Sequence, residues 1–476
     1  MSRSIAKNAA FMTVASVGQK IIAFVYFTLI ARNIGVESTG KYFFAISFTT
    51  IFVIFVDLGL TNVLIREAAK MKEKIQTYFS TIISVKILLG ILSYIGAVLA
   101  INLMGYPVET KQLVYLSAVT MLFDSLHLTI YGTLRAIGDL KYEAISIVGS
   151  QLVTLVLGSI FLYEGLPLIY LILAFTIPSF LNVLFAIFIA YNKYKIRFIP
   201  YFDKKVFVYL GKITIPFAIA AVFARFYSYI DSILLSKMAG DAAVGWYSIP
   251  YKITYAFQFI PLALVAALYP RFSQYFSEDK EKLAYIFERG MKYLLIIAFP
   301  IAVGIGLIAG DIILLLYGKE YINSILPLKI LVSSLIFSFV SFPIGAFLNA
   351  CNKQVTQTTI VGIVLVVNVV LNILLIPRFN VVGASIAALV GNIVLTILGY
   401  IMVPMVTKIS HSFIFKALFQ IVISVSVMGV FVWFINGLAN FTIAILAGVV
   451  VYPVMLFVTR AVTREQLAEA LALVRR

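Results

Sequence analysis

Residues 18–66 read GQKIIAFVYFTLIARNIGVESTGKYFFAISFTTIFVIFVDLGLTNVLIR, and the same pattern returns 205 positions later (225 − 20) over residues 223–271. In each copy a cation lies within an apolar run, a Gly-x₄-Gly-x-Tyr turn follows, and an Arg ends the unit after a second apolar run. The matched pairs are Lys20 and Arg225, Arg32 and Lys237, Gly35 and Gly240, Gly40 and Gly245, Tyr42 and Tyr247, and Arg66 and Arg271. Because internal repeats of this kind build two-lobed transporters around a central site, the pattern predicts two related lobes.

The composition indicates a polytopic membrane protein. The chain has 476 residues, of which 62% are hydrophobic and 12% charged, and its mean hydropathy is +1.05. Soluble domains are roughly 45–50% apolar and about 25% charged. The net charge of +17 would suggest nucleic acid in a soluble protein. Here we interpret it as loop charge that orients the membrane spans, and we expect no nucleic-acid partner.

Hydropathy predicts an all-α chain with about fourteen spans, each long enough to cross about 30 Å of hydrocarbon. Their approximate limits are 9–31, 42–64, 77–102, 112–134, 143–163, 167–191, 207–236, 244–269, 291–317, 325–348, 356–377, 383–406, 413–435 and 440–460. We expect a six-helix N-terminal lobe at 1–200, with a linker at 192–206, and a six-helix C-terminal lobe at 201–406. Two extra helices at 407–462 and an amphipathic cytoplasmic tail at 463–476 would follow. The first run lacks a cleavage pattern and is longer than a signal peptide needs, so we expect it to be retained.

The distribution of Lys and Arg predicts the orientation of the array. With the N-terminus inside, the inner loops and both tails hold 25 of the 37 Lys and Arg, and the outer loops hold 6. Inner loops carry the excess of positive charge in membrane proteins. The pattern therefore predicts a multi-pass protein of the cytoplasmic (inner) membrane with both termini in the cytoplasm.

Four of the cations inside predicted spans are candidates for a central cavity: Lys20, Lys86, Arg225 and Lys252. A charge at the centre of a helix costs about 2.5–3.5 kcal/mol on insertion scales, so none should face lipid. If all four face one cavity, they would attract an anionic substrate and repel a cationic one. Each could instead be a paired structural group, and Lys86 and Lys252 could also snorkel to the membrane interfaces.

Titratable groups of other kinds also lie within spans. Asp57 and Asp231 are interpreted as structural carboxylates that pair with cations inside the bundle. Asp124 and His127 are three residues apart and therefore share a helix face. That pair could bind a coupling proton or sodium ion, or could be a satisfied polar cluster.

The sequence has no pattern typical of an enzyme. It contains two histidines, His127 and His411, and one cysteine, Cys351, which is too few for a His/Cys metal cluster. It also lacks the G-x₄-GK[ST] loop that binds nucleotide phosphates. We expect no catalytic residues, no metal and no cofactor.

Several short motifs resemble a known family. The first group is Ala31-Arg32-Asn33-Ile34-Gly35, Gly40-Lys41-Tyr42, Asp57-Leu58-Gly59-Leu60 and Arg66; the second is Leu268-Tyr269-Pro270-Arg271 and Asn368-x₃-Asn372-x₂-Leu375-Ile376-Pro377 with Gly383-Ala384. In order and spacing, over the first twelve spans, they resemble the polysaccharide or O-antigen (Wzx-like) flippases of the multidrug/oligosaccharidyl-lipid/polysaccharide (MOP) exporter superfamily.

The resemblance implies two six-helix lobes that alternate between inward-open and outward-open states. It implies an isoprenoid (pyro)phosphate-linked oligosaccharide as cargo, and polysaccharide polymerase machinery as a candidate partner. A cationic cavity is consistent with such an anionic cargo. Three alternatives remain open at this point: a flippase for the lipid-linked peptidoglycan precursor, a multidrug and toxin exporter, which would favour an acidic cavity, and a scaffold that transports nothing.

Overall fold

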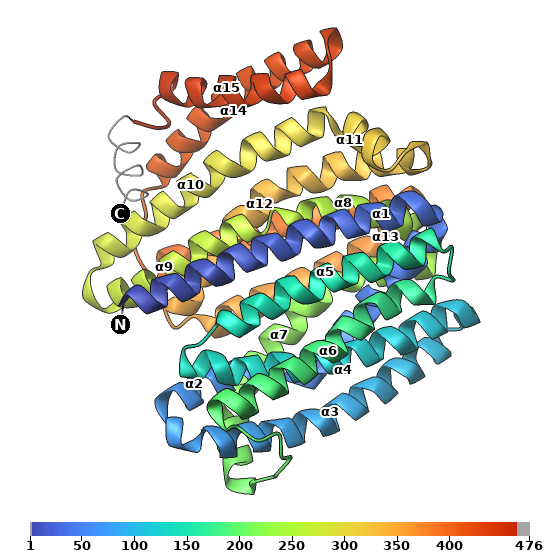
Figure 1. The fold of residues 1–476 in the computed structure, drawn as a ribbon. Helices are drawn as coiled ribbons and strands as arrows, with labels where there is room; N and C mark the ends of the chain where they lie inside the picture. The colour runs from blue at the N-terminus through green and yellow to red at the C-terminus, as the bar shows by residue number, and fades with distance from the viewer. Residues whose placement is uncertain (1, 464–476) are drawn as a thin grey trace. The chain divides into compact units, whose positions relative to one another are not determined.

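The computed structural model describes residues 2–463 and, apart from residues 2–10 and 215–217, their side chains. The described chain is helical and contains no strands (Figure 1). The α-helices are α1 (Ser2–Asp57), α2 (Leu60–Lys70), α3 (Ile75–Leu103), α4 (Val108–Ile137), α5 (Lys141–Tyr163), α6 (Ile169–Tyr194), α7 (Lys204–Ala239), α8 (Asp241–Ala256), α9 (Phe259–Glu278), α10 (Lys280–Leu307), α11 (Ala309–Leu316), α12 (Ile325–Ala350), α13 (Gln354–Met402), α14 (His411–Leu438) and α15 (Phe441–Val458). Short 3₁₀ helices are η1 (Lys72–Lys74), η2 (Lys319–Ser324) and η3 (Val403–Met405). The predicted tail at 463–476 lies outside the described residues from position 464 onward.

The number of spans agrees with the prediction. Twelve helical segments of the described chain are long and apolar enough to cross a membrane. The two longest, of 60 and 52 residues, are each broken near the middle by a residue with non-helical backbone angles, Gly35 in α1 and Asn380 in α13. Dividing these two segments at those residues gives fourteen spans (12 + 2), so the all-α polytopic fold is confirmed.

Gly35 reverses the direction of α1. Its φ of 76° and ψ of 173° lie in a region that is essentially restricted to glycine. The rings of Phe27 and Phe43 are 6.2 Å apart, although sixteen residues of straight helix would separate them by roughly 24 Å. The two halves of α1 therefore form a helical hairpin, which corresponds to the first two predicted spans.

Three predicted spans contain breaks that hydropathy did not indicate. The span at 42–64 is interrupted at Leu58 and Gly59, which both have positive φ. The span at 244–269 divides into α8 and α9, and the span at 291–317 divides at Ile308. Pro261 lies in the first turn of α9, where a missing backbone N–H removes no helical hydrogen bond. Hydropathy averages over a window, so it does not detect a break that leaves the chain apolar.

The chain divides into two compact units, Met1–Ser248 and Ile249–Arg476. In the first unit α4 packs against α1, α2, α3 and α6, and α7 packs against α1, α2 and α3. In the second unit α12 packs against α9, α10 and α13, while α14 and α15 pack against each other and α14 against α10. The unit boundary thus lies after α7, whereas the lobe boundary at the 192–206 linker stays a prediction from the repeat.

The two repeat turns meet inside the first unit. Gly240 has φ 85° and ψ 179°, nearly the backbone angles of its partner Gly35. A Cβ built on Gly40 would overlap the backbone carbonyl of Asp241, and one built on Gly245 would overlap the backbone carbonyl of Val36. Val36 and Asp241 are themselves 205 positions apart. The contact is therefore reciprocal, as a pseudo-two-fold relation between the two copies requires.

We predict that Gly40→Ala and Gly245→Ala each lower the free energy of unfolding by about 1–3 kcal/mol, because the added methyl group meets backbone that cannot rotate away. The measurement is the thermal midpoint of the purified protein in detergent. Gly149→Ala in α5 is the matched control, since a Cβ there has no atom within 4 Å. Equal midpoints for wild type and all three variants would contradict the close turn contact.

Candidate functional site

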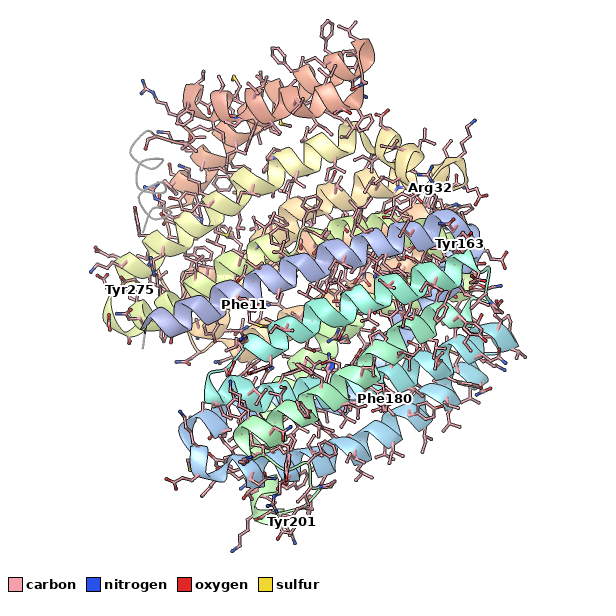
Figure 2. All side chains as sticks on the ribbon, viewed as in Figure 1. Phe11, Arg32, Tyr163, Phe180, Tyr201 and Tyr275 are labelled. Carbon is pink, nitrogen blue, oxygen red and sulfur yellow. The ribbon has the colours of Figure 1, made fainter. Side chains whose placement is uncertain are left out.

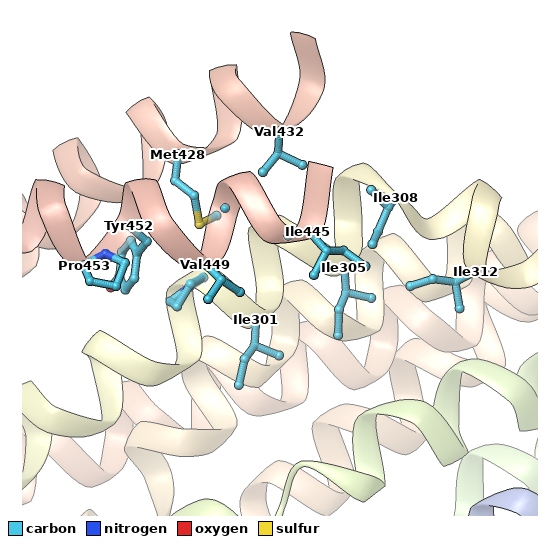
Figure 3. Close-up of a pocket in the computed structure, with 13 residues that line it drawn as sticks. Ile301, Ile305, Ile308, Ile312, Met428, Val432, Ile445, Val449, Tyr452 and Pro453 are labelled. Atoms are coloured by element: carbon cyan, nitrogen blue, oxygen red, sulfur yellow. The ribbon is translucent and has the colours of Figure 1, made fainter. Parts of the chain in front are cut away.

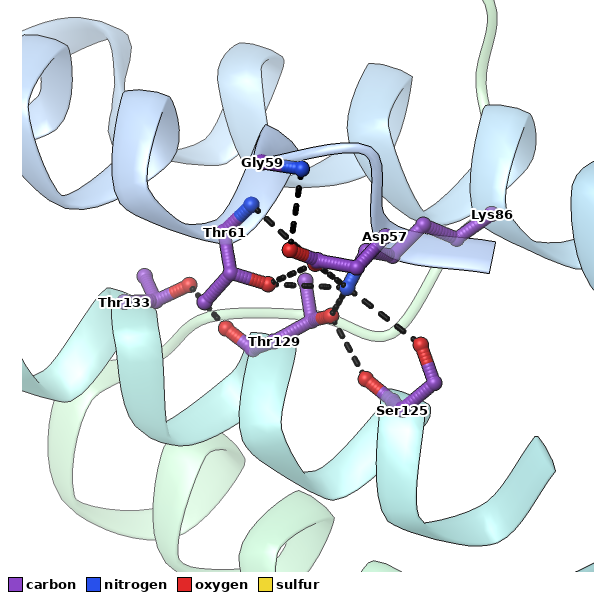
Figure 4. Close-up of polar contacts among 7 residues, drawn as sticks. All are labelled: Asp57, Gly59, Thr61, Lys86, Ser125, Thr129 and Thr133. Atoms are coloured by element: carbon purple, nitrogen blue, oxygen red, sulfur yellow. Dashed lines mark hydrogen bonds and ion pairs between the residues drawn. The ribbon is translucent and has the colours of Figure 1, made fainter. Parts of the chain in front are cut away.

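Lys86 is the most deeply buried of the predicted cavity cations. Its side chain extends from α3, is 2% exposed, and forms an ion pair with Asp57. Its Nζ also donates to the hydroxyl groups of Thr61 at 2.8 Å, Thr129 at 2.7 Å and Ser125 at 3.3 Å (Figure 4). An ammonium has three protons, and four oxygens compete for them. In this arrangement Lys86 has no proton left over for a cargo anion.

Asp57 also explains the break between α1 and α2. Its carboxylate accepts hydrogen bonds from the backbone N–H groups of Gly59 (3.1 Å) and Thr61 (3.3 Å) and from the Thr61 hydroxyl group. A carboxylate that bonds to the backbone just beyond it favours a turn over continued helix. The turn places Asp57 against Lys86 of the adjacent helix, so the charge pair and the helix break form together.

Lys20 and Arg225 occupy matched places in the first unit. Lys20 lies on the first half of α1 and Arg225 on α7, and both are half-buried. The guanidinium group of Arg225 lies 5.9 Å from the ring centroid of Tyr229. Each cation precedes its turn glycine by fifteen positions, which is roughly 22 Å of helix. They therefore lie at equivalent distances from the turns.

The other predicted residues are distributed differently. Asp231 is buried in α7 and accepts a hydrogen bond from the Tyr247 hydroxyl group at 3.0 Å. Lys252 lies on α8 beyond residue 248, within the second unit, and is half-buried. The role of Lys252 as a cavity cation stays a prediction.

Asp124 and His127 share one face of α4. His127 Nε2 is 4.0 Å from Asp124 Oδ1, and the Ser179 hydroxyl group of α6 donates to that carboxylate at 2.6 Å. His127 Nδ1 is buried and has no hydrogen-bond partner among the described residues. A carboxylate beside a histidine with one unsatisfied nitrogen can exchange a proton.

Sequence reasoning missed two buried polar groups of the first unit. Asn182 of α6 accepts hydrogen bonds from Tyr131 of α4 (2.7 Å) and from Ser146 of α5. Glu67 of α2 is fully buried and binds Lys70, Arg66 and the Tyr209 hydroxyl group of α7, the last at 2.8 Å. A charged residue that interrupts an apolar stripe at the end of a span was the available signal for Glu67. No comparable signal marked Asn182.

The second unit contains an apolar pocket of about 420 Å³ between α10, α11, α14 and α15 (Figure 3). Ile301, Ile305 and Ile312 line it on one side, and Val432, Ile445 and Val449 line it on the other. No charged residue is among its lining residues. Such a pocket suits a hydrocarbon chain and would not hold a charged group.

Two family patterns match the chain. Residues 5–276, more than half of its length, match the family described as polysaccharide biosynthesis protein, and residues 216–374 match the family described as MatE. The first range contains Lys20, Asp57, Lys86 and Arg225. Both families point to a membrane transporter.

Curated relatives are similar to parts or most of the chain. A probable flippase, AglR, from Haloferax volcanii is 31% identical over 169 residues, which is 35% of each chain. The capsular polysaccharide biosynthesis protein CapF from Staphylococcus aureus is 24% identical over 407 residues, 83% of this chain and 98% of that protein. The chain thus spans about a third of the length of the first relative (35%) and nearly all of the second.

A solved structure has the same fold. The lipid II flippase MurJ, in an inward closed conformation, superposes with a TM-score of 0.74 over 93% of this chain and 97% of that protein, at 20% identity. The likeness covers helices of both units. At this level of identity it bears on the fold alone.

We predict that Asp57→Asn and Lys86→Met each reduce folded yield strongly, because either change leaves one buried charge without its partner, at a cost of about 3–5 kcal/mol. The double variant should recover much of the loss, since it removes both charges. The measurement is the monodisperse fraction after detergent extraction, with Lys329→Met, an exposed lysine of α12, as control. Normal yield with abolished transport for Asp57→Asn would make its role one of coupling.

Proposed function

Since the chain belongs to the polysaccharide biosynthesis protein family, the Wzx-like flippase branch of the MOP exporter superfamily, we propose that it translocates an isoprenoid (pyro)phosphate-linked oligosaccharide across the cytoplasmic membrane. It would do so by alternating access, with both termini in the cytoplasm. The observation that carries this proposal is that Lys20 and Arg225 occupy matched positions of the two repeat copies, each inside an apolar helix.

The chemistry of the two cations suits a phosphate. Charges attract more strongly in a poorly hydrated site than in water, so half-buried cations can hold an anionic headgroup inside the membrane. Arg225 offers a planar fork that can bind two phosphate oxygens at once, whereas Lys20 offers a point charge. The pair would therefore favour an anionic cargo, with Arg225 giving the geometric preference.

The second unit, taken by itself, has two features that suit sugar rings and lipid chains. Tyr251 and Tyr255 lie one turn apart on either side of Lys252, with ring centroids 6.0 Å apart and planes at 10°. Flat aromatic faces of this kind suit the apolar faces of sugar rings. The apolar pocket beside α14 and α15 suits part of an isoprenoid chain.

The close contact of the repeat turns supports an alternating mechanism. Gly40 and Gly245 bring the two repeat turns together at the end of the first unit opposite the α2–α3 connection, mainly through backbone atoms. Opening this contact would also require breaking the hydrogen bonds from Lys237 to the Met104 carbonyl (2.6 Å) and from Tyr106 to Ser236 (3.0 Å). We propose that it closes the outer side and separates when the cargo leaves.

Coupling is assigned to Asp124 and His127, with a proton or sodium ion as the coupling ion. The pair lies beside Ser179 and within the same unit as Lys20 and Arg225. A lipid-linked peptidoglycan precursor would also suit a cationic site, so the transport assay includes it as a second cargo. Transport of cationic drugs would instead favour an exporter.

We predict that Arg225→Ala loses most of the flipping activity, that Arg225→Lys keeps part of it, and that Lys20→Ala resembles Arg225→Ala. The alanine variants should still insert, because each removes a charge that is costly within the membrane. The measurement is flipping of lipid-linked oligosaccharide in reconstituted vesicles at matched protein content.

Lys212→Ala is the control for this experiment, because Lys212 is an exposed lysine on the same helix as Arg225. It should flip cargo at the wild-type rate. Near-normal flipping by the Lys20→Ala, Arg225→Ala double variant would refute the cationic-site mechanism. A wild-type protein that flips neither cargo would favour a scaffold instead.

A further inference from the structure

Side chains of the linker after α6 point alternately into the core of the first unit and toward its surface. Lys195 has a positive φ of 56°, and the backbone N–H of Ile196 donates to the carbonyl of Ala190, which ends α6. Ile196 is 6% exposed, and Phe198 packs edge-on against Phe79 of α3 at 6.2 Å. The alternate residues, Lys195, Arg197, Ile199 and Tyr201, therefore point the other way.

Those alternate residues form one wall of a polar pocket. The pocket has a volume of about 480 Å³, and Gln76, Thr77 and Ser80 from the start of α3 form the opposite wall. The Gln76 carboxamide both donates to the Arg197 carbonyl and accepts from the Arg197 backbone N–H, each at 2.9 Å. The linker is thus held against α3 through its backbone, which leaves the Arg197 guanidinium group exposed.

The pocket lies in a region of uncompensated positive charge. Six cations of this region are exposed and make no ion pair within the described part of the chain: Lys72, Lys74, Lys195, Arg197, Lys204 and Lys205. Two carboxylates lie near them in sequence. Glu73 is exposed in η1, and Asp203 accepts hydrogen bonds from the backbone N–H groups of Lys205 and Val206. The balance therefore favours an anionic ligand.

The same linker exposes large apolar side chains. Ile199 is 52% exposed, Tyr201 61% and Phe202 51%. Figure 2 labels Tyr201 among the side chains of the first unit. Three such residues in four positions are costly in water. Beside a run of cations at the end of a membrane span they are typical of a segment in the membrane interface, where aromatic rings lie at the level of the lipid headgroups.

We propose that this linker pocket binds the phosphate headgroup of an anionic glycerophospholipid from the leaflet on the N-terminal side of the protein. Lys195 and Arg197 would contact the phosphate, and Ile199 and Tyr201 would contact the adjoining glycerol and acyl carbons. Gln76 is a positioning residue, because it holds the linker in place without carrying charge. The site is separate from Lys20 and Arg225 and does not depend on the identity of the cargo.

The test is native mass spectrometry of the full-length protein in detergent, titrated with phosphatidylglycerol or with phosphatidylcholine of the same chain length. Wild type should retain phosphatidylglycerol in preference. Lys195→Gln and Arg197→Gln should each weaken that binding by roughly fivefold, since a basic residue at an anionic membrane surface contributes about that factor. Binding of phosphatidylcholine should not change. Thermal midpoints verify that these exposed substitutions leave the fold intact.

Two matched variants distinguish a built pocket from diffuse charge. Lys204→Gln removes an exposed charge of the same linker that does not line the pocket, and it should have little effect. Gln76→Ala keeps every charge and should weaken phosphatidylglycerol binding severalfold. If Lys204→Gln weakens binding as much as Lys195→Gln, or if Gln76→Ala changes nothing, the pocket assignment is overturned. Inorganic phosphate at the lipid concentration should not displace the lipid; displacement would make this a free-anion site.

Discussion

Hydrocarbon does not solvate charge, and the arrangement of the first unit follows from that constraint. Lys86 can be buried in α3 only because Asp57 neutralises it and three hydroxyl groups share the remaining N–H donors of its ammonium group. Those partners come from α1, α2 and α4, so one buried charge specifies how four helices pack. The turn at Leu58 and Gly59 belongs to the same arrangement. In a continuous helix the Asp57 carboxylate would not point toward the backbone N–H groups of Gly59 and Thr61.

The carboxylate that pairs with Lys86 is present in the first copy of the repeat and has no equivalent in the second. The position 205 residues after Asp57 is Leu262, which is 48% exposed. The second copy also breaks its helix earlier, at Phe257 and Gln258, six positions before the equivalents of Leu58 and Gly59. The two copies therefore share the turn geometry at Gly35 and Gly240 but differ in how their second helices are interrupted.

The sequence predicted features that depend on neighbours along the chain. The offset of 205 identified Gly35 and Gly240, and their backbone angles agree to within about ten degrees, because glycine at these angles is a local requirement. Features that depend on distant partners could not be predicted. Nothing near Lys86 in the sequence points to Asp57, and Gln76 lies 121 positions from the linker residue it holds. Charge in the linker was visible from the sequence, but its alternation between core and pocket required the structure.

The candidate cavity cations Lys20, Lys86, Arg225 and Lys252 differ in how deeply their side chains are buried. Lys86 has its ammonium protons engaged by oxygens of its own unit, so a cargo phosphate could reach it only by displacing Asp57. Displacement would leave a carboxylate buried without its partner, and that cost opposes binding. Lys20 on α1 and Arg225 on α7 are half-buried instead, so they are more accessible than Lys86. Burial thus distinguishes Lys86 from Lys20 and Arg225, the matched cations of the repeat that lie inside the predicted spans.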